Sequence, residues 1–159
     1  MKRIDQINAT FIKLTDRTIK RVAEAQQEAR QKICEDIKAG ANVDTGAYRD
    51  SIKVAGTVID GTQVYTDIYS RLTLGGDNPT WQNVPLARII ENGTIPHFIE
   101  PRNPNGVLRW EDENGVHYAK WVFHPGTTAN PHWSTALLKN RRYYRNMIRK
   151  AVLKSLWKT

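Results

Sequence analysis

Residues 107–123 read VLRWEDENGVHYAKWVF, and this stretch decides the fold class. Asn114 and Gly115 form the strongest short-range signal for a β-hairpin, because both tolerate the left-handed backbone of a two-residue turn. Such a turn pairs Trp110 with Ala119 and places alternate apolar residues on one face. The face predicted to be buried consists of Leu108, Trp110, Ala119, Trp121 and Phe123. The sequence therefore predicts an antiparallel hairpin over residues 107–123.

Helical patterns lie on both sides of this strand region. Apolar residues recur every three to five positions without proline or glycine until Gly40, which predicts a helix over residues 4–39. At 1.5 Å per residue this helix would be about 50 Å long, so part of it should project or contact another subunit. The period returns after Pro131 and predicts a helix over residues 131–157.

Residues 51–69 carry a second strand pattern. Ile52, Val54 and Val58 share one face of an ideal strand, and a three-residue loop at residues 59–61 would return the chain as a hairpin.

An aperiodic stretch then predicts a loop over 70–83, followed by a short helix over 84–91. The pattern predicts a single α+β domain over residues 1–159, with a long N-terminal helix and a basic C-terminal helix packed on an antiparallel sheet built from two hairpins.

The composition is that of a folded chain, with 40% apolar residues and five tryptophans. No apolar run approaches the roughly 20 residues of a membrane span, and charges interrupt the N-terminal apolar residues, so neither a membrane partner nor a signal peptide is expected. Cys34 is the single cysteine, which excludes an internal disulfide and a multi-cysteine zinc site.

The positive charge is concentrated at the C-terminal end. The net charge is +8, and eight basic residues with no acidic residue lie from Lys139 onwards. Arg142, Arg145 and Arg149 are three and four residues apart and therefore share one helix face. This face is predicted to contact DNA phosphates without sequence preference or an acidic protein surface, and a merely solvated basic face is the alternative.

The candidate catalytic and metal-binding residues do not converge in the sequence. His124 and His132 lack the spacing of a helical zinc pair, and Cys34 lies on the apolar stripe of the first helix. The acidic run 111–113 occupies a hairpin end, where solvated charges are expected. We therefore expect no catalytic site, no cofactor and no metal ion.

Three stretches in order resemble a known family. They are VDTGAYRDSIKV at 43–54, ARIIENGTIPHFIEPRNPNGVLRW at 87–110 and WVFHPGTTANPHWSTAL at 121–137. They are similar to the ordered elements of the gene-product-ten-like tail-completion proteins of long-tailed bacteriophages, also called neck or head–tail joining proteins. The motif residues are Asp44, Thr45, Gly46, Arg49, Glu91, Gly93, Thr94, His124, Pro125 and Gly126.

Structural roles are expected for these motif residues. Gly46 and Gly93 would supply backbone angles that other residues resist, and Asp44 or Thr45 would cap a short turn. His124 and the Pro125-Gly126 pair would turn the last strand towards the final helix.

The resemblance implies a virion structural protein made in the bacterial host cytoplasm. It would be a subunit of a homo-oligomeric neck ring, a hexamer by family likeness, that completes the tail and joins it to the DNA-filled head. Its partners would be copies of itself, neighbouring neck and tail-tube proteins and DNA in the channel. The alternatives are a small nucleic-acid-binding protein that uses the basic C-terminal helix, and a nuclease or hydrolase with dispersed residues.

Overall fold

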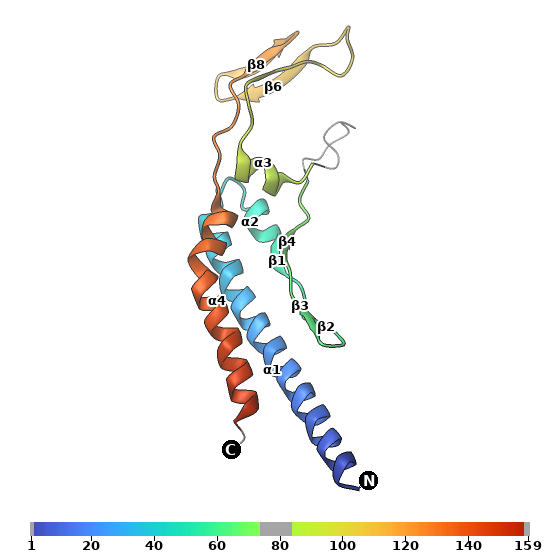
Figure 1. Cartoon of the computed structure of the whole chain (residues 1–159). Coiled ribbons are helices and arrows are strands. Elements are labelled where there is room, and N and C mark those ends of the chain that lie inside the picture. Colours follow the sequence, from blue (N-terminus) through green and yellow to red (C-terminus); the bar gives the residue numbers. More distant parts are fainter. Residues whose placement is uncertain (1, 74–83, 158–159) are drawn as a thin grey trace. The chain divides into compact units, whose positions relative to one another are not determined.

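The computed structural model describes residues 2–73 and 84–157 (Figure 1). The chain divides into two compact units, which we call the helical unit (Met1–Arg71 with His132–Thr159) and the strand unit (Leu72–Pro131). The described elements are α1 (Lys2–Gly40), α2 (Ala47–Ser51), β1 (Ile52–Val54), β2 (Val58–Asp60), β3 (Gln63–Tyr65), β4 (Ile68–Ser70), α3 (Leu86–Asn92), β5 (His97–Ile99), β6 (Leu108–Asp112), β7 (Gly115–Ala119), β8 (Val122–His124) and α4 (His132–Leu156).

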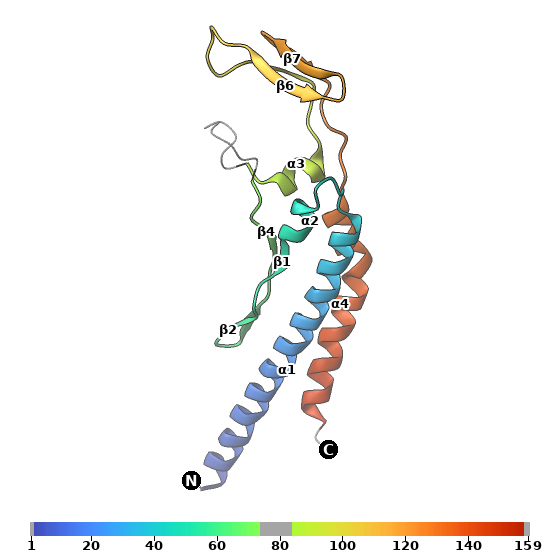
Figure 2. The ribbon, with the colours of Figure 1, turned by 180° about the vertical axis from the view of Figure 1, so that it is seen from behind.

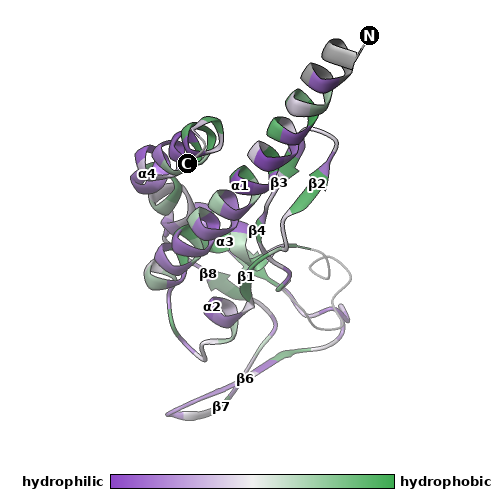
Figure 3. Cartoon of the chain, turned by 90° about the horizontal axis from the view of Figure 1, so that it is seen from below, coloured by the Kyte–Doolittle hydropathy of each residue, from purple (hydrophilic) through white to green (hydrophobic). Residues whose placement is uncertain are grey.

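The core of the helical unit lies where α1 packs along α4, and the two helices are side by side in Figures 1 and 2. Hydrophilic and hydrophobic residues alternate along both helices in Figure 3, as amphipathic helices require. The buried apolar residues are Ala23, Ala25, Ala29, Ile33, Cys34, Ile37, Ala41, Tyr48, Ile52, Ala136 and Ala151. Alanine is the commonest of these, so much of the seam between the helices is built from small side chains.

Two arginines of α1 hold the C-terminal end of α4. Arg17 Nη2 donates to the Ser155 carbonyl and Arg21 Nη1 to the Lys154 carbonyl, each at 2.7 Å. Cations at this position donate hydrogen bonds to the last carbonyls of a helix and interact favourably with the negative end of its dipole. The part of α1 before Arg17 extends past the end of α4 (Figures 1 and 2), and its Phe11 and Ile12 are exposed. The sequence expectation that part of this helix projects is therefore met.

The strands of the helical unit form two antiparallel pairs, β1 with β4 and β2 with β3. Asp60 pairs with Gln63, so the loop has two residues and begins at Gly61, whose φ is 57°. The three-residue loop predicted at residues 59–61 is wrong.

A bulge at Gly56 separates the two pairs. Ala55 N–H donates to the Asp67 carbonyl at 2.8 Å, and the Thr57 and Thr66 hydroxyls lie 2.7 Å apart, so the first strand holds one extra residue between these contacts. A bulge of one residue reverses which side chains share a face. Val58 consequently lies on the face opposite Ile52 and Val54 and is 59% exposed, which corrects the predicted shared face.

In the strand unit, β6 and β7 pair in a register two residues from the predicted one. Asp112 pairs with Gly115, and Trp110 faces His117 in place of Ala119. The Asp112 side chain explains the difference, because its Oδ1 accepts the Asn114 N–H at 2.7 Å and lies 3.0 Å from His117 Nε2. This side-chain turn ends β6 before Asn114.

The predicted second hairpin is also shorter than 107–123. Residues Val122–His124 form β8, which pairs with β5, so β8 does not continue the β6–β7 pair. The α+β class and both long helices are confirmed, but the described strands make four separate two-stranded sheets where one sheet was predicted.

Some predicted features remain open. The loop predicted over 70–83 lies largely outside the described residues, although its first residue, Ser70, belongs to β4. The single domain over residues 1–159 stays a prediction. Among the described residues, neither long helix carries an apolar stretch of the length a bilayer crossing needs.

Candidate functional site

The loop before α2 is built on the backbone of Gly46. Gly46 has φ 83° and ψ −14°, and its carbonyl accepts the Asp50 N–H at 3.0 Å. Thr45 Oγ1 lies a long 3.4 Å from the Ala47 nitrogen, and Asp44 is exposed. Within the described part of the chain no side-chain hydrogen bond caps α2, so the predicted cap by Asp44 or Thr45 is replaced by the glycine conformation.

This turn places Tyr48 against the start of α4. The Tyr48 hydroxyl lies 2.9 Å from His132 Nε2 and accepts the Trp133 Nε1–H at 2.9 Å. Tyr48 and His132 are both buried. Arg49 instead points to solvent, where its Nε lies 3.4 Å from Asp50 Oδ1, an exposed pair that contributes little to stability. The turn therefore serves to place Tyr48 in a buried cluster with His132 and Trp133, which connects α2 to α4.

The ENGT and HPGT stretches meet in the strand unit. Thr94 and Thr127 exchange two backbone hydrogen bonds of 3.0 and 3.2 Å, and the Thr127 N–H also reaches Thr94 Oγ1 at 2.9 Å. Two motifs that are 33 residues apart in the sequence thus form one backbone junction.

Glycines on both sides allow this close approach. A β-carbon at Gly93 would lie 2.3 Å from the Thr127 carbonyl oxygen, and one at Gly126 would lie 2.3 Å from the Thr94 carbonyl oxygen. Their φ angles are 69° and 89°, which side chains with a β-carbon also resist. Each position must be glycine, because the backbone of the other motif leaves no room for a β-carbon there.

The remaining motif residues surround the junction. His124 Nδ1 accepts the Gly126 N–H at 3.0 Å, which fixes the turn that begins at Pro125. The His97 ring lies 5.1 Å from the His124 ring across the β5–β8 pair. Glu91 lies in the last turn of α3, directly before the junction.

An aromatic surface lies beside the junction. The Phe98 ring is 5.3 Å from the Trp121 ring and 5.2 Å from the Phe123 ring, and these three residues are 61%, 59% and 53% exposed. Trp110 is 40% exposed. The predicted burial of the apolar hairpin face is therefore wrong for Trp110, Trp121 and Phe123. The reason is that β8 pairs with β5 and does not extend the β6–β7 hairpin, and nothing in the described chain covers that face.

The basic face of α4 points away from α1. Arg142, Arg145 and Arg149 are exposed, whereas the face that packs on α1 contains Ala136 and Ala151. At 100° per residue the same outward face also carries Leu138, Leu153 and Leu156, which are 72%, 44% and 54% exposed. No ion pair or hydrogen bond within the described part of the chain engages these three arginines.

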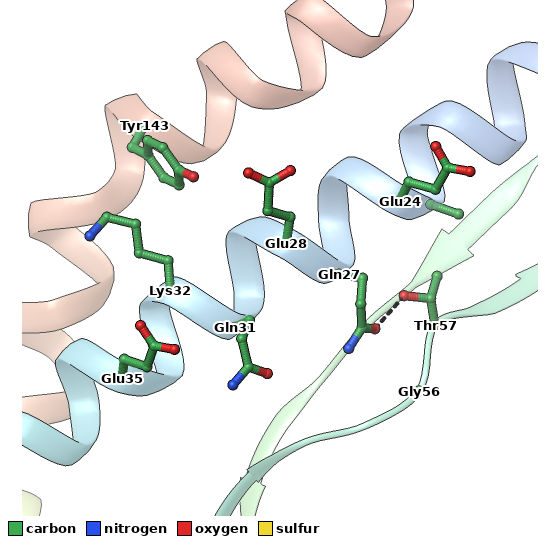
Figure 4. A pocket seen from close by; sticks show the side chains of 10 residues that line it. Glu24, Gln27, Glu28, Gln31, Lys32, Glu35, Gly56, Thr57 and Tyr143 are labelled. Atoms are coloured by element: carbon green, nitrogen blue, oxygen red, sulfur yellow. Dashed lines mark hydrogen bonds between the residues drawn. The ribbon is translucent and has the colours of Figure 1, made fainter.

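A groove of about 980 Å³ follows α1 between Tyr143 of α4 and the Gly56-Thr57 segment that precedes β2 (Figure 4). Its charged lining consists of Glu24, Glu28, Glu35 and Lys32, so the carboxylates are in excess. Lys32 Nζ lies 5.8 Å from the centre of the Tyr143 ring. The groove is thus an acidic surface on a chain whose net charge is +8.

Two titratable groups at the helix seam have shifted pKa values. The Asn140 Nδ2 donates to Asp36 Oδ2 at 2.6 Å, and this hydrogen bond, with Lys139 3.6 Å from Asp36 Oδ1, lowers the pKa of Asp36. Burial raises the pKa of Cys34, which is 2% exposed. Cys34 is therefore a buried apolar residue, as the sequence predicts.

The described histidines, cysteine and carboxylates form no cluster of three or more that could hold a metal ion. His97 and His124 face each other, and His132 hydrogen-bonds to Tyr48, so each of these histidines has a structural neighbour.

A family model matches residues 5–93, which include most of α1, the Gly46 turn and Gly93. That model describes HK97-gp10-like bacteriophage tail components. The chain belongs to the HK97-gp10-like family. No curated protein and no solved structure matches the chain.

Membership of the HK97-gp10-like family makes this chain a structural component of the phage tail and a virion protein, and it confirms the resemblance seen in the sequence. The matched range ends at Gly93, so the HPGT motif and the basic helix lie outside it. The structure nevertheless joins Gly93 to Thr127 and Ala129 through close backbone contacts.

Sequence reasoning missed two features of this family member. One is the Tyr48–His132–Trp133 cluster, in which His132 and Trp133 are 84 and 85 residues from Tyr48 in the chain, so no local pattern connects them. The acidic groove was also missed, since its carboxylates are spread over three turns of α1. Glu24, Glu28 and Glu35 are separated by four and seven residues, which are spacings that place side chains on one face of a helix. This spacing is the signal that indicates a shared acidic face.

Proposed function

We propose that this tail component is a subunit of a homo-oligomeric neck ring, with six subunits, that completes the tail and joins it to the DNA-filled head. Its role is assembly and not turnover. The family assignment supports a place in the tail, and the motif glycines Gly46, Gly93 and Gly126 form backbone turns and a junction.

The observation that carries the ring proposal is the strand unit's lack of a core. Every described apolar residue that is buried belongs to the helical unit. Phe98, Trp121, Phe123 and Tyr118 of the strand unit are all more than half exposed. Exposed aromatic surface of this kind marks contact sites with other proteins. Neighbouring subunits and adjacent neck or tail-tube proteins would cover it.

The projecting part of α1 gives a second reason. Phe11 and Ile12 are 65% and 62% exposed on a helix segment that extends past α4. A helix that is not covered by its own chain gains stability from packing against another one.

Electron cryo-microscopy of intact particles tests the proposal directly. Density for this fold should form a closed ring between the head portal and the tail tube. A phage that lacks the protein should accumulate DNA-filled heads and unjoined tails. Density along the tube or at the distal tip, or normal joining without the protein, would refute the neck assignment.

DNA binding is a second candidate function, favoured by the exposed Arg142, Arg145 and Arg149. If it were the main activity, the purified protein would remain monomeric and bind duplex DNA with an affinity that falls steeply with salt. Light scattering and filter binding on the same sample separate the two functions.

A further inference from the structure

We propose that the outward face of α4 in one subunit docks along the acidic groove of α1 in a second copy of this chain. The inference rests on the proposed ring and names the surfaces that would join its subunits. The two surfaces are the outward α4 face, with Arg142, Arg145 and Arg149, and the groove, with Glu24, Glu28 and Glu35.

Charge complementarity identifies the occupant of the groove. The groove has three carboxylates and one ammonium group, and Lys32 already lies over the Tyr143 ring. The α4 face has three guanidinium groups and no carboxylate. Figure 4 shows Glu28 and Lys32 on the side of α1 towards α4 and Gln27 directed to Thr57 of the hairpin segment, so the groove is open between them.

The charged groups on both surfaces are available for a partner. Among the described residues, no ion pair engages Glu24, Glu28 or Glu35. Arg21, Lys150 and Lys154 line an adjacent hollow with Glu24 and Glu28, and in the described chain none of these cations forms an ion pair with the two carboxylates. The subunit therefore leaves both charge sets to solvent.

The dimensions of the two surfaces are compatible. Arg142 and Arg149 are separated by about 10 Å along α4, and Glu24 and Glu35 by about 16 Å along α1, at 1.5 Å per residue. Long arginine side chains span the difference, and the exposed Leu138 and Leu153 supply apolar contact at either end of the arginine row.

The geometry of this contact favours a ring. One copy offers its α4 face and the next offers its groove, so the first keeps an unused groove and the second keeps an unused α4 face. Such a head-to-tail contact repeats and closes into a ring when the rotation between subunits allows it. Rim charges mainly set specificity and association rate, so the assembly should weaken as salt rises.

Charge reversal tests the contact. The groove variant is Glu24→Lys with Glu28→Lys and Glu35→Lys, and all three positions are exposed, so helix α1 should remain folded. Its matched control has the same change in charge on exposed residues elsewhere, Asp60→Lys with Glu100→Lys and Glu113→Lys. Circular dichroism and thermal unfolding check that both variants are folded.

The helix variant is Arg142→Glu with Arg145→Glu and Arg149→Glu. Its control is Lys13→Glu with Lys53→Glu and Lys120→Glu, again at exposed positions. Sedimentation velocity at several protein and salt concentrations measures self-association. Each test variant alone should associate about tenfold more weakly than the wild type, and each control should associate as the wild type does.

Mixing the two variants gives the decisive result. The groove variant carries positive charge on both surfaces and the helix variant carries negative charge on both. Each variant therefore repels copies of itself, while both contacts between one variant and the other are attractive. The mixture should therefore recover assembly, and so should a single chain that carries all six substitutions.

Several outcomes would overturn the inference. One is a wild type that stays monomeric at about 1 mM, another is normal assembly of either variant alone, and a third is failure of the mixture to recover. Normal assembly of the helix variant with loss of duplex DNA binding would assign the arginines to DNA. The neck assignment would survive any of these results, because imaging of intact particles tests it separately.

Discussion

The helical unit and the strand unit are held together by different interactions. In the helical unit, buried side chains such as Ile37 and Ile52 pack α1 against its neighbours. In the strand unit no described residue is buried, and the contacts are backbone hydrogen bonds between short strands and between Thr94 and Thr127. The helical unit resembles an ordinary folded domain, while the strand unit has the surface of a protein interface. The comparison teaches that, among the described residues, only the helical unit has a hydrophobic core.

The largest effect is expected from removing a core side chain of the helical unit. Ile37 is 0% exposed, so Ile37→Ala should lower the free energy of unfolding by about 2–5 kcal/mol through lost burial and a cavity. Chemical denaturation followed by circular dichroism measures it. Val58→Ala is the control, because Val58 is 59% exposed and should change stability by no more than about 0.5 kcal/mol. Equal effects of the two substitutions would show that α1 does not pack as described.

A glycine substitution should break the strand unit in a different way. Gly93→Ala adds a β-carbon 2.3 Å from the Thr127 carbonyl oxygen at φ 69°, so the junction should be destabilised by about 2–4 kcal/mol. Hydrogen exchange of the Thr94 and Thr127 amides reports on the loss.

Gly61→Ala is the control that separates the cost of a positive φ from the cost of the close contact between the added β-carbon and the backbone. Gly61 has φ 57° but no atom within 4 Å of the added β-carbon, so it should cost only about 1–2 kcal/mol. If Gly93→Ala costs no more than Gly61→Ala, the close approach at Thr127 does not exist.

The buried polar cluster of the helical unit should give an intermediate effect. Tyr48→Phe removes the hydroxyl that accepts from Trp133 and contacts His132, so the free energy of unfolding should fall by about 1–3 kcal/mol. Tyr118→Phe is the control, since Tyr118 is 64% exposed. An unchanged unfolding midpoint for Tyr48→Phe would mean that water replaces the hydroxyl without cost.

Acid should reveal a smaller contribution at the helix seam. The pKa of Asp36 is lowered below its ordinary value of 3.8, first by the Asn140 hydrogen bond, so the unfolded chain binds its proton at higher pH than the folded chain does. The stability from this group is therefore present above about pH 4 and is lost as pH falls through the lowered pKa. Urea denaturation between pH 2 and 6, about the range in which carboxylates titrate, measures the slope.

Asn140→Ala should return the pKa of Asp36 towards its ordinary value and reduce that slope. Lys139→Ala should reduce it less, because the Lys139 charge is a lesser cause of the shift than the Asn140 hydrogen bond. A Lys139→Ala effect larger than that of Asn140→Ala would contradict the assigned cause.

The smallest effect on the isolated subunit is expected at the aromatic surface. Trp121→Ala should change the free energy of unfolding of the subunit by no more than about 1 kcal/mol, because Trp121 is 59% exposed and its ring packs edge-on against Phe98, which is itself exposed. The same variant should assemble more weakly in the sedimentation assay. A large loss of subunit stability would show that Trp121 is part of a core, as the sequence alone predicts.

Several elements could be predicted from local sequence, and particular residues show why others could not. Gly61 adopts the positive φ expected of a hairpin glycine, yet the loop is one residue shorter than expected because Asp60 pairs with Gln63. The NG pair marks a turn, but hydrogen bonds of Asp112 move it by one residue along the chain. Turn composition reports that a chain reverses, while side-chain hydrogen bonds select the residue at which it does so.

Of the two candidate sites, local sequence predicts the arginine face but not the acidic groove. Arg142, Arg145 and Arg149 share an exposed face, as helical spacing requires, whereas the groove needs α4 and the hairpin beside α1. A groove is a property of several elements, so no local pattern contains it.

The sequence by itself determined the two long helices, the α+β class, the segregation of charge and the family, because periodicity and motif order are properties of one segment at a time. The tertiary structure alone decided that β8 pairs with β5, that Gly56 forms a bulge, and that Gly93 and Gly126 lie against each other's motifs. The physical reason is that a strand pairs with the distant partner that loses the least loop-closure entropy and satisfies its backbone hydrogen bonds. The pattern of a strand specifies only which of its own faces is apolar.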